Sequence, residues 1–229
     1  MIIQAATYNI AGGAGYSGFP VVTDYRKIAE DILACGADIV GLQEVDHLTR
    51  RNNMQDTGAE IAKYTGFHVY FAAATEMDGG TYGNLLVTKF PILHAQTIPV
   101  PFTRENEEHR CVLHAKLDIG ESTPLDVFVT HSDQGSIRAQ LGRIHELTAA
   151  CERFLLLGDF NYADKKEDSA FGVFENCTLA NPITKPLVTT FDGYSFDNII
   201  VPDTVALCYP TLINTGNSDH LMLKATLTL

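Results

Sequence analysis

Apolar residues recur along the chain at two spacings, which predict strands and helices in succession. Largely apolar segments at residues 2–10 and 38–42 are predicted strands. Between them, apolar residues recur at helical spacing at Ile28, Ile32 and Cys35. Thr23 or Asp24 suits the start of that helix as a cap, and Gly36 suits its end. The order strand, helix, strand predicts a β-α-β unit with parallel strands.

The same succession returns in the second half of the chain. Residues 125–130 and 154–157 are predicted strands. The segment between them carries one apolar helix face, formed by Ile137, Leu141, Ile144 and Leu147. The chain therefore contains two predicted β-α-β units.

Further elements are predicted between and after these units. They are strands at residues 82–89, 92–100 and 111–119, a short helix at residues 56–64, and a strand-rich segment from residue 195 onward. No linker rich in Pro, Gly or Ser divides the chain. We predict a single domain over residues 1–229 with an α/β fold, in which two packed mixed β-sheets are flanked by helices as a four-layer sandwich.

Composition supports a globular domain and adds a constraint on its partners. Hydrophobic residues make up 45% of the 229 residues and charged residues 19%, which is enough apolar surface for a substantial core. The 16 Lys and Arg against 28 Asp and Glu give a net charge of −12. Such a field repels phosphate polymers and disfavours loose binding to nucleic acid. A bound metal would have to offset this repulsion locally.

Several other classes of site lack their sequence signals. The five cysteines are scattered and show no C-x-x-C spacing, so neither a disulfide framework nor a zinc knuckle is predicted. No H-E-x-x-H pair and no G-x-S-x-G motif is present. A G-x-G-x-x-G motif does occur at residues 13–18, but Pro20 and its β-branched neighbours follow it where a dinucleotide site needs a helix. We interpret that segment as a flexible loop.

The sequence carries no membrane or secretion signal. No segment approaches the roughly 18 consecutive apolar residues of a membrane-spanning helix. Residues 1–4 lack the basic start and the apolar run of a signal peptide. We expect no integral membrane segment and a cytoplasmic location, an expectation that covers only the chain as printed. The oligomeric state is left open.

Polar residues stand where predicted strands end or just before the next strand begins. They are Asn9, Glu44, His131, Asp159, Asn161, Asp219 and His220. Each alone is explained by turn chemistry, because Asp and Asn are common after strands. Together they predict a site, since ligands of α/β folds bind outside the carboxyl ends of strands.

The motifs around these residues resemble a known family. In chain order they are Thr-Tyr-Asn-Ile at 7–10, Gly-Leu-Gln-Glu-Val-Asp at 41–46, Tyr-Gly-Asn at 82–84, Thr-His at 130–131, Gly-Asp-Phe-Asn at 158–161, Phe-Asp-Asn-Ile-Ile at 196–200 and Ser-Asp-His at 218–220. Each piece is short, but their order and spacing resemble those of the endonuclease/exonuclease/phosphatase superfamily, which has the deoxyribonuclease I-like fold. The chain looks like a small, bacterial-type member.

The resemblance implies a metal site and a catalytic set. Glu44 matches the family's principal metal carboxylate, Asn9 matches its partner, and Asp219 would assist a metal or hold His220 in place. Oxygen ligands of this kind suit Mg²⁺, and Mn²⁺ can substitute.

The implied catalytic residues are His131, Asp159, Asn161, Asp197 and His220. Asp159 would orient or deprotonate the attacking water, and Asn161 would donate to the phosphorus centre. Asp197 would pair with His220 and fix its tautomer. The resemblance permits either Asp159 or the Asp197–His220 pair as the general base, and we favour His220 as the base or as a direct contact to the phosphate. His131 would protonate the leaving oxygen.

Three further residues are candidates for binding the substrate phosphate, namely Asn84, Arg51 and Arg110. Arginine suits this task because its planar fork donates two hydrogen bonds. Arg50 and Arg51 equally suit a solvated loop.

We therefore predict a divalent-metal-dependent phosphoesterase. A small phosphorylated substrate is favoured by the acidity of the chain, with a phosphodiester or a lipid headgroup first. Two alternatives remain: a metal-dependent nuclease that uses a local positive potential, and a non-catalytic module that binds a phosphorylated ligand. A steep salt dependence of DNA binding would indicate the nuclease.

Overall fold

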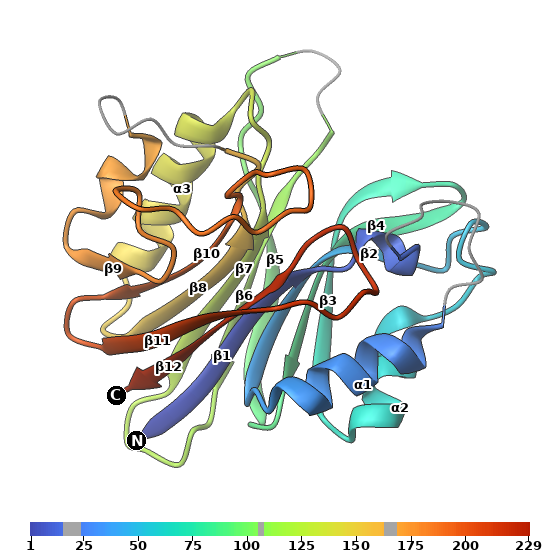
Figure 1. Ribbon diagram of the computed structural model, residues 1–229, viewed down its shortest axis with the longest axis horizontal. Coiled ribbons are helices and arrows are strands. Elements are labelled where there is room, and N and C mark those ends of the chain that lie inside the picture. The colour runs from blue at the N-terminus through green and yellow to red at the C-terminus, as the bar shows by residue number, and fades with distance from the viewer. Residues whose placement is uncertain (16–23, 105–107, 163–168) are drawn as a thin grey trace.

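The computed structural model describes residues 1–15, 24–104, 108–162 and 169–229. The candidate cap Thr23 and the second half of the motif at residues 13–18 lie outside these ranges. Within them the chain forms two six-stranded sheets with helices on their outer faces (Figure 1).

The first sheet is built around a parallel pair of strands. Its strands, in sheet order, are β11 (Ala206–Ile213), β12 (Met222–Thr228), β1 (Ile2–Asn9), β2 (Ile39–His47), β4 (Gly80–Thr88) and β3 (His68–Met77). The parallel neighbours β1 and β2 are joined by helix α1 (Tyr25–Cys35), and the other pairings are antiparallel. The predicted first β-α-β unit is present.

The second sheet repeats this arrangement. Its order is β5 (Ile92–Pro99), β6 (Cys111–Leu117), β7 (Leu125–His131), β8 (Phe154–Asp159), β10 (Asp197–Pro202) and β9 (Cys177–Leu179). Strands β7 and β8 are parallel and are joined by helix α3 (Ile137–Ala149). Short 3-10 helices lie at η1 (Ala11–Gly13) and η2 (Ala170–Phe174).

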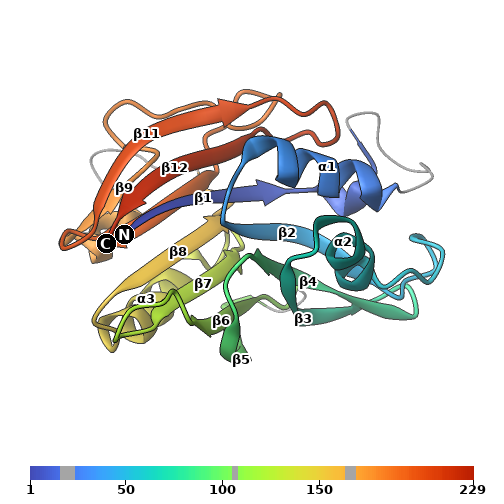
Figure 2. The ribbon, with the colours of Figure 1, turned by 90° about the horizontal axis from the view of Figure 1, so that it is seen from below.

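The layers stack as helices, sheet, sheet, helices. Helices α1 and α2 (Thr57–Thr65) cover the first sheet, and α3 covers the second on the opposite side of the molecule (Figure 2). Three apolar clusters fill the three interfaces between these layers, and the largest lies between the two sheets. The predicted four-layer sandwich is confirmed. None of the described helices has the length and apolar character needed to cross a bilayer.

The helix ends follow the expected capping chemistry. The Asp24 side chain caps α1 by accepting from the Arg26 backbone N–H, and Gly36 ends the helix at φ +68°. Asp56 caps α2 in the same way through the Ala59 N–H, so that helix begins one residue later than predicted. Short polar side chains thus set where both helices begin.

The strand predictions were incomplete, and the short strand β9 was among those not predicted. Strand β3 was not predicted, and it lies at the edge of the first sheet with most of its side chains half-buried or exposed. Strand β2 was predicted to end at Leu42 but continues to His47. Its register against β4 shifts between Leu42 and Val45, so that Gln43 and Glu44 form an irregularity within the strand.

Gly41 shows how closely the sheets pack and yields a first prediction. A Cβ atom at this position would lie 2.9 Å from the Leu157 Cβ and 3.0 Å from a Val129 methyl, both on the facing sheet. We expect Gly41→Ala to lower the free energy of unfolding by about 1–3 kcal/mol because the core would be overpacked. Urea unfolding measures this change.

Gly142 in α3 is the matched control, since a Cβ there meets no atom within 4 Å. Gly142→Ala should raise the free energy of unfolding by about 0.5–1 kcal/mol, because glycine is a poor helix former. Equal effects of the two substitutions would contradict the close approach of the sheets at Gly41.

Candidate active site

The strand ends bring the predicted residues to one edge of the two sheets. Asn9 is opposite Gln43 at the end of the parallel pair β1–β2. His131 is opposite Asp159 at the end of the parallel pair β7–β8. Asp197 begins the antiparallel strand β10 directly beside Asp159. Sheet register therefore gathers groups that are far apart in the sequence.

Asn9 connects the carboxylates of the two sheets. Its side-chain nitrogen donates to Glu44 Oε1 at 3.0 Å and to Asp159 Oδ2 at 2.8 Å. Its side-chain oxygen accepts from the Ala11 backbone N–H at 2.9 Å, which fixes the orientation of the amide. Asn9 is 1% exposed. It positions Glu44 and Asp159, and a direct role of Asn9 at the metal stays a prediction.

Glu44 is aimed by an unusual backbone conformation. Its φ of +57° lies in the left-handed region, where non-glycine residues are uncommon and concentrate at functional sites. The side chain is 33% exposed, which leaves it one accessible side. Burial, and then the nearby charge of Asp159, raises the pKa of the Glu44 carboxyl. Two acids held this close favour a bound cation between them.

Asp197 and His220 form a buried ion pair. His220 Nδ1 lies 2.9 Å from Asp197 Oδ2, and His220 Nε2 lies 3.7 Å from Asp159 Oδ2. Burial of the ring opposes its charged form, but the carboxylates of Asp197, Asp159 and Asp219 outweigh burial and raise the pKa of His220 to about 10. The ring is therefore an imidazolium at neutral pH, with Nε2–H directed toward Asp159.

Ser218 holds this histidine in place. Its hydroxyl donates to the Asn9 carbonyl at 2.7 Å and accepts from the His220 backbone N–H at 3.1 Å. Ser218 is completely buried. The Ser-Asp-His motif was recognised in the sequence, but this positioning role of its serine was not predicted.

His131 has a different environment from His220. Arg110 Nη1 lies 2.8 Å from His131 Nδ1, and the Asn161 side-chain amide lies 2.7 Å from Nε2. A guanidinium only donates, so Nδ1 accepts from Arg110. The Asn161 atom beside Nε2 is the amide nitrogen, which also donates to the Ser132 carbonyl at 3.2 Å.

Burial and nearby positive charges keep the His131 ring neutral. Burial, followed by the charges of Arg110 and His220, lowers the pKa of His131 well below its ordinary value. A neutral ring is not a ready source of a proton at neutral pH. The role of His131 as the general acid stays a prediction.

The Gly-Asp-Phe-Asn turn presents Asp159 and Asn161 together. The Asn161 backbone N–H donates to Asp159 Oδ1 at 2.8 Å, and Asn161 adopts φ +47°. Phe160 between them is fully buried and anchors the turn. Gly158 is required because a Cβ there would lie 2.7 Å from a Thr130 methyl. Each residue of the motif thus has its own local cause.

The three predicted phosphate donors are placed differently from one another. Arg51 donates twice to the buried Asp46 carboxylate, at 2.8 Å each. The Asn84 amide nitrogen donates to the Cys111 carbonyl at 3.0 Å, and this side chain is 1% exposed. Arg110 contacts His131 directly and is also paired with Glu108 at 3.3 Å. Arg110 contacts the catalytic set through His131, and phosphate binding by each of the three stays a prediction.

Two neighbours of this set were not predicted. Glu108 pairs with Arg110. Burial raises the pKa of the Glu108 carboxyl, and the charge of Arg110 opposes that rise only in part. Burial, and then the charge of Glu44, raises the pKa of the Tyr82 hydroxyl well above its ordinary value. Tyr82 belongs to the Tyr-Gly-Asn motif, so the sequence carried a signal for it, whereas Glu108 stood in no motif.

The donor atoms fit a hard divalent cation at Glu44. One of its carboxylate oxygens, Oε1, is held by Asn9, and the charges of Asp159 and of the exposed Asp219 act on the Glu44 carboxyl. A more compact group, with ligand atoms within 4.8 Å of one another, consists of Asp159, Asp197 and His220. In that group the protonated His220 ring is already bound to Asp197, so it suits acid–base chemistry better than coordination.

The chain resembles a known protein family in sequence and several solved structures in fold. The Endonuclease/Exonuclease/phosphatase family pattern matches residues 6–220 of the chain. None of the curated proteins compared with the chain matches it. An endonuclease/exonuclease/phosphatase from Beutenbergia cavernae superimposes with a TM-score of 0.80 at 17% identity, covering 100% of this chain and 72% of that chain.

Two further solved structures superimpose over almost the whole chain. The human Nocturnin catalytic domain with bound sulfate has a TM-score of 0.75 at 21% identity, covering 99% of this chain and 93% of that chain. ANGEL2, described as a 2′,3′-cyclic phosphatase, has a TM-score of 0.73 at 16% identity, covering 99% of this chain and 95% of that chain. At these identities the structural likeness establishes the fold.

Proposed function

The chain belongs to the Endonuclease/Exonuclease/phosphatase family, and on that premise we propose that it is a divalent-metal-dependent phosphoesterase. Its reaction is the hydrolysis of a phosphate ester by in-line attack of water. One observation carries this proposal: Asp159 Oδ2 accepts from Asn9, which also holds Glu44, and lies 3.7 Å from Nε2 of both His131 and His220. Acid, base and donor groups therefore converge on one point.

Glu44 would hold the cation, with Asn9 fixing the carboxylate and Asp219 assisting from the exposed side. Mg²⁺ is the first choice and Mn²⁺ the second, because both prefer oxygen ligands. When bound, the cation neutralises charge on the phosphate oxygens. The acidic surroundings of the site make that neutralisation necessary for an anionic substrate to enter.

Asp159 is the better candidate for the general base. His220 is held as an imidazolium by Asp197 and therefore has no lone pair with which to accept a proton. Burial, and then the charge of Asp197, raises the pKa of Asp159, which makes it a stronger acceptor than an ordinary carboxylate. His220 then donates from Nε2 to a phosphate oxygen, where it stabilises developing negative charge.

His131 and Asn161 complete the set as neutral donors. Arg110 donates to His131 Nδ1, so a proton on Nε2 would be offered to substrate where a phosphate oxygen displaces the Asn161 amide from that nitrogen. Asn161 lies beside that nitrogen and shares the turn with Asp159. These groups orient the phosphate for attack without adding a negative charge.

A small phosphodiester or a lipid headgroup is the proposed substrate class. The net charge of −12 works against a nucleic-acid polymer, whose binding depends on many cationic contacts. Nocturnin is described with a bound sulfate and ANGEL2 as a cyclic phosphatase, so proteins with this fold accept compact oxyanions. These descriptions support a phosphoester substrate for this chain.

Hydrolysis of reporter esters tests the proposal. Chelator-treated protein is assayed with bis-p-nitrophenyl phosphate and p-nitrophenyl phosphate before and after addition of Mg²⁺ or Mn²⁺. We expect hydrolysis after metal addition, with the diester favoured. A rate that is the same with and without metal contradicts the proposal, as does the absence of hydrolysis of any phosphate ester in a wider panel.

A further inference from the structure

A second cluster of metal-ligating side chains lies on the outer face of the second sheet. His114, Asp126 and Cys151 each offer one ligand atom, and these three atoms lie within 4.8 Å of one another. The residues come from β6, from β7 and from the segment that follows α3. The other such group in the described part of the chain belongs to the active site.

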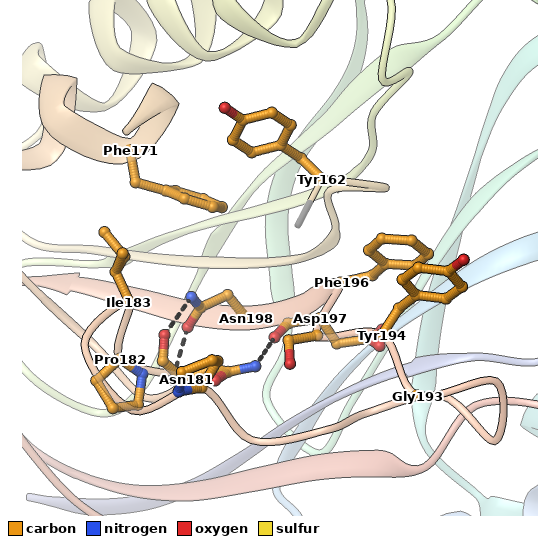
Figure 3. A pocket seen from close by; sticks show the side chains of 12 residues that line it. Tyr162, Phe171, Asn181, Pro182, Ile183, Gly193, Tyr194, Phe196, Asp197 and Asn198 are labelled. Carbon is orange, nitrogen blue, oxygen red and sulfur yellow. Dashed lines mark hydrogen bonds between the residues drawn. The ribbon is translucent and has the colours of Figure 1, made fainter. Parts of the chain in front are cut away.

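The cluster is well separated from the active site. Asp126 lies at the beginning of β7 and His131 at its end, so roughly 17 Å of strand lies between them. The cavity beside Asp197, where Figure 3 shows the Asn181 amide bound to the Asp197 carbonyl, lies at the active-site end of the sheet. The cluster therefore takes no direct part in the proposed hydrolysis.

The register of β6 against β7 places the imidazole on the carboxylate. His114 is opposite Phe128, and Lys116 is opposite Asp126, so His114 and Asp126 are diagonal neighbours on one face of the sheet. His114 Nε2 lies 2.6 Å from Asp126 Oδ1. The imidazole ring also stacks on Phe128, with centroids 4.4 Å apart and planes within 6°. The ring is therefore fixed with Nε2 directed at the carboxylate.

Cys151 completes the cluster from the helix side. Its Sγ donates to the Leu147 carbonyl at 3.5 Å, and the half-buried side chain packs against the apolar cluster under α3. Burial, and then the charge of Asp126, raises the pKa of the Cys151 thiol to about 11. A thiol that stays protonated is a poor nucleophile, so a catalytic role for this cysteine is disfavoured. Metal ligation remains open to it, because a bound metal itself displaces the thiol proton.

A positive charge already lies on the buried carboxylate. Lys116 Nζ is 3.3 Å from Asp126 Oδ1 and 3.5 Å from Oδ2. The Lys116 side chain is 48% exposed, whereas that of Asp126 is 9% exposed. The ammonium can therefore turn into solvent and leave the carboxylate to another cation. The Asp126 carboxylate is thus a cation-binding group whose present partner is replaceable.

The mixed donor set selects the kind of cation. One imidazole nitrogen, one carboxylate oxygen and one sulfur suit Zn²⁺, whereas Mg²⁺ prefers oxygen ligands alone. In a tetrahedral zinc site with bonds of about 2.0–2.3 Å, the ligand atoms lie roughly 3.3–3.7 Å apart. Small side-chain rotations would bring the three atoms to that spacing. Gln96, 3.2 Å from His114 Nδ1, can turn its amide oxygen to accept the ring proton.

We propose that His114, Asp126 and Cys151 bind a Zn²⁺ ion, with water as the fourth ligand. On binding, the Cys151 thiol releases its proton to solvent. The resulting thiolate and the Asp126 carboxylate then balance the two charges of the ion. The ion ties the end of α3 to β6 and β7, and so stabilises the fold. This site is additional to the proposed catalytic metal at Glu44 and does not depend on it.

Co²⁺ tests the site because it is a spectroscopic substitute for Zn²⁺. A thiolate bound to Co²⁺ gives a charge-transfer absorption band in the near ultraviolet, which the oxygen and nitrogen ligands of the active site do not produce. Reduced, metal-free protein is titrated with Co²⁺. We expect the band to saturate at one Co²⁺ per chain in the wild type, to be abolished by Zn²⁺ and to be absent in Cys151→Ser.

Cys177→Ser is the matched control. Cys177 is also half-buried, and burial also raises the pKa of its thiol to about 11, but it lies on β9 outside the cluster. This variant should keep the band. Absence of the band from the wild type overturns the proposal, as does a band that persists in Cys151→Ser or in the presence of Zn²⁺.

Two further variants keep the thiol and test its partners. His114→Gln should weaken Co²⁺ binding by more than about 100-fold, since loss of an outer-shell partner alone costs 10- to 100-fold. Lys116→Gln should strengthen binding about two- to fivefold, because the competing ammonium of an exposed ion pair is removed. Unchanged binding in either variant overturns the proposed ligand set. Mg²⁺-dependent hydrolysis by the same variants should equal that of the wild type, which reports separately on folding and on the active site.

Discussion

Glu44→Gln is expected to lower metal-dependent hydrolysis of bis-p-nitrophenyl phosphate by about 10³-fold, which is the scale of losing several kcal/mol of charge stabilisation. The glutamine oxygen can still accept from Asn9, so the side chain should keep its position and lose its charge. Measurement of kcat/KM at saturating Mg²⁺ gives the effect. Glu146→Gln, an exposed substitution on α3, should change the rate very little.

Loss of folding would not explain such a result. The Glu44 carboxyl has a raised pKa, so its ionised form is less favourable in the folded chain than in the unfolded chain. This charge therefore opposes folding as pH rises through its folded pKa, and neutralising it should not lower stability at pH 7. A variant that retains wild-type activity would contradict the assignment of Glu44, and one that unfolds would contradict this account of its charge.

Asp197→Asn is expected to lower the rate by about 10²- to 10⁴-fold, because His220 would lose the partner that fixes its tautomer and its charge. His220→Ala should have an effect of the same size. Since the two residues act as one unit, the double variant should be no slower than the slower single variant. Steady-state rates of the three variants with the diester reporter measure this coupling.

His94→Ala is a control for the histidine substitution, because His94 is exposed on β5. It should leave the rate unchanged. Additive effects of the two active-site substitutions would show that Asp197 and His220 act independently, contrary to the buried 2.9 Å contact between them.

The layered fold was predictable because its helices and buried strands have different apolar spacings. Asp24 and Gly36 marked the ends of α1, and the apolar face of α3 was visible as Ile137, Leu141 and Ile144. Strand β3 escaped prediction because it is a half-exposed edge strand that contains three successive alanines. The prediction for β2 stopped at Leu42 because the residues after it are mostly polar, although the fold buries most of them.

The sequence indicated which residues lie together better than it indicated the contacts that they make. Asn9, Glu44, Asp159, Asp197 and His220 come together as the family resemblance implies. The contact of Arg110 with His131 depends on their neighbouring strands β6 and β7, and no local pattern indicates it. Nor does a pattern show that the Asn84 amide is bound to Cys111 or that Arg51 is paired with Asp46.

Metal binding can be tested without knowing the natural substrate, which makes it the most direct measurement. Mn²⁺ is titrated calorimetrically into metal-free wild-type protein, Glu44→Gln and Glu146→Gln. The account predicts binding to the wild type and to Glu146→Gln, and loss of that binding in Glu44→Gln. Indistinguishable binding by all three proteins, or no binding by the wild type, would contradict a catalytic metal site at Glu44.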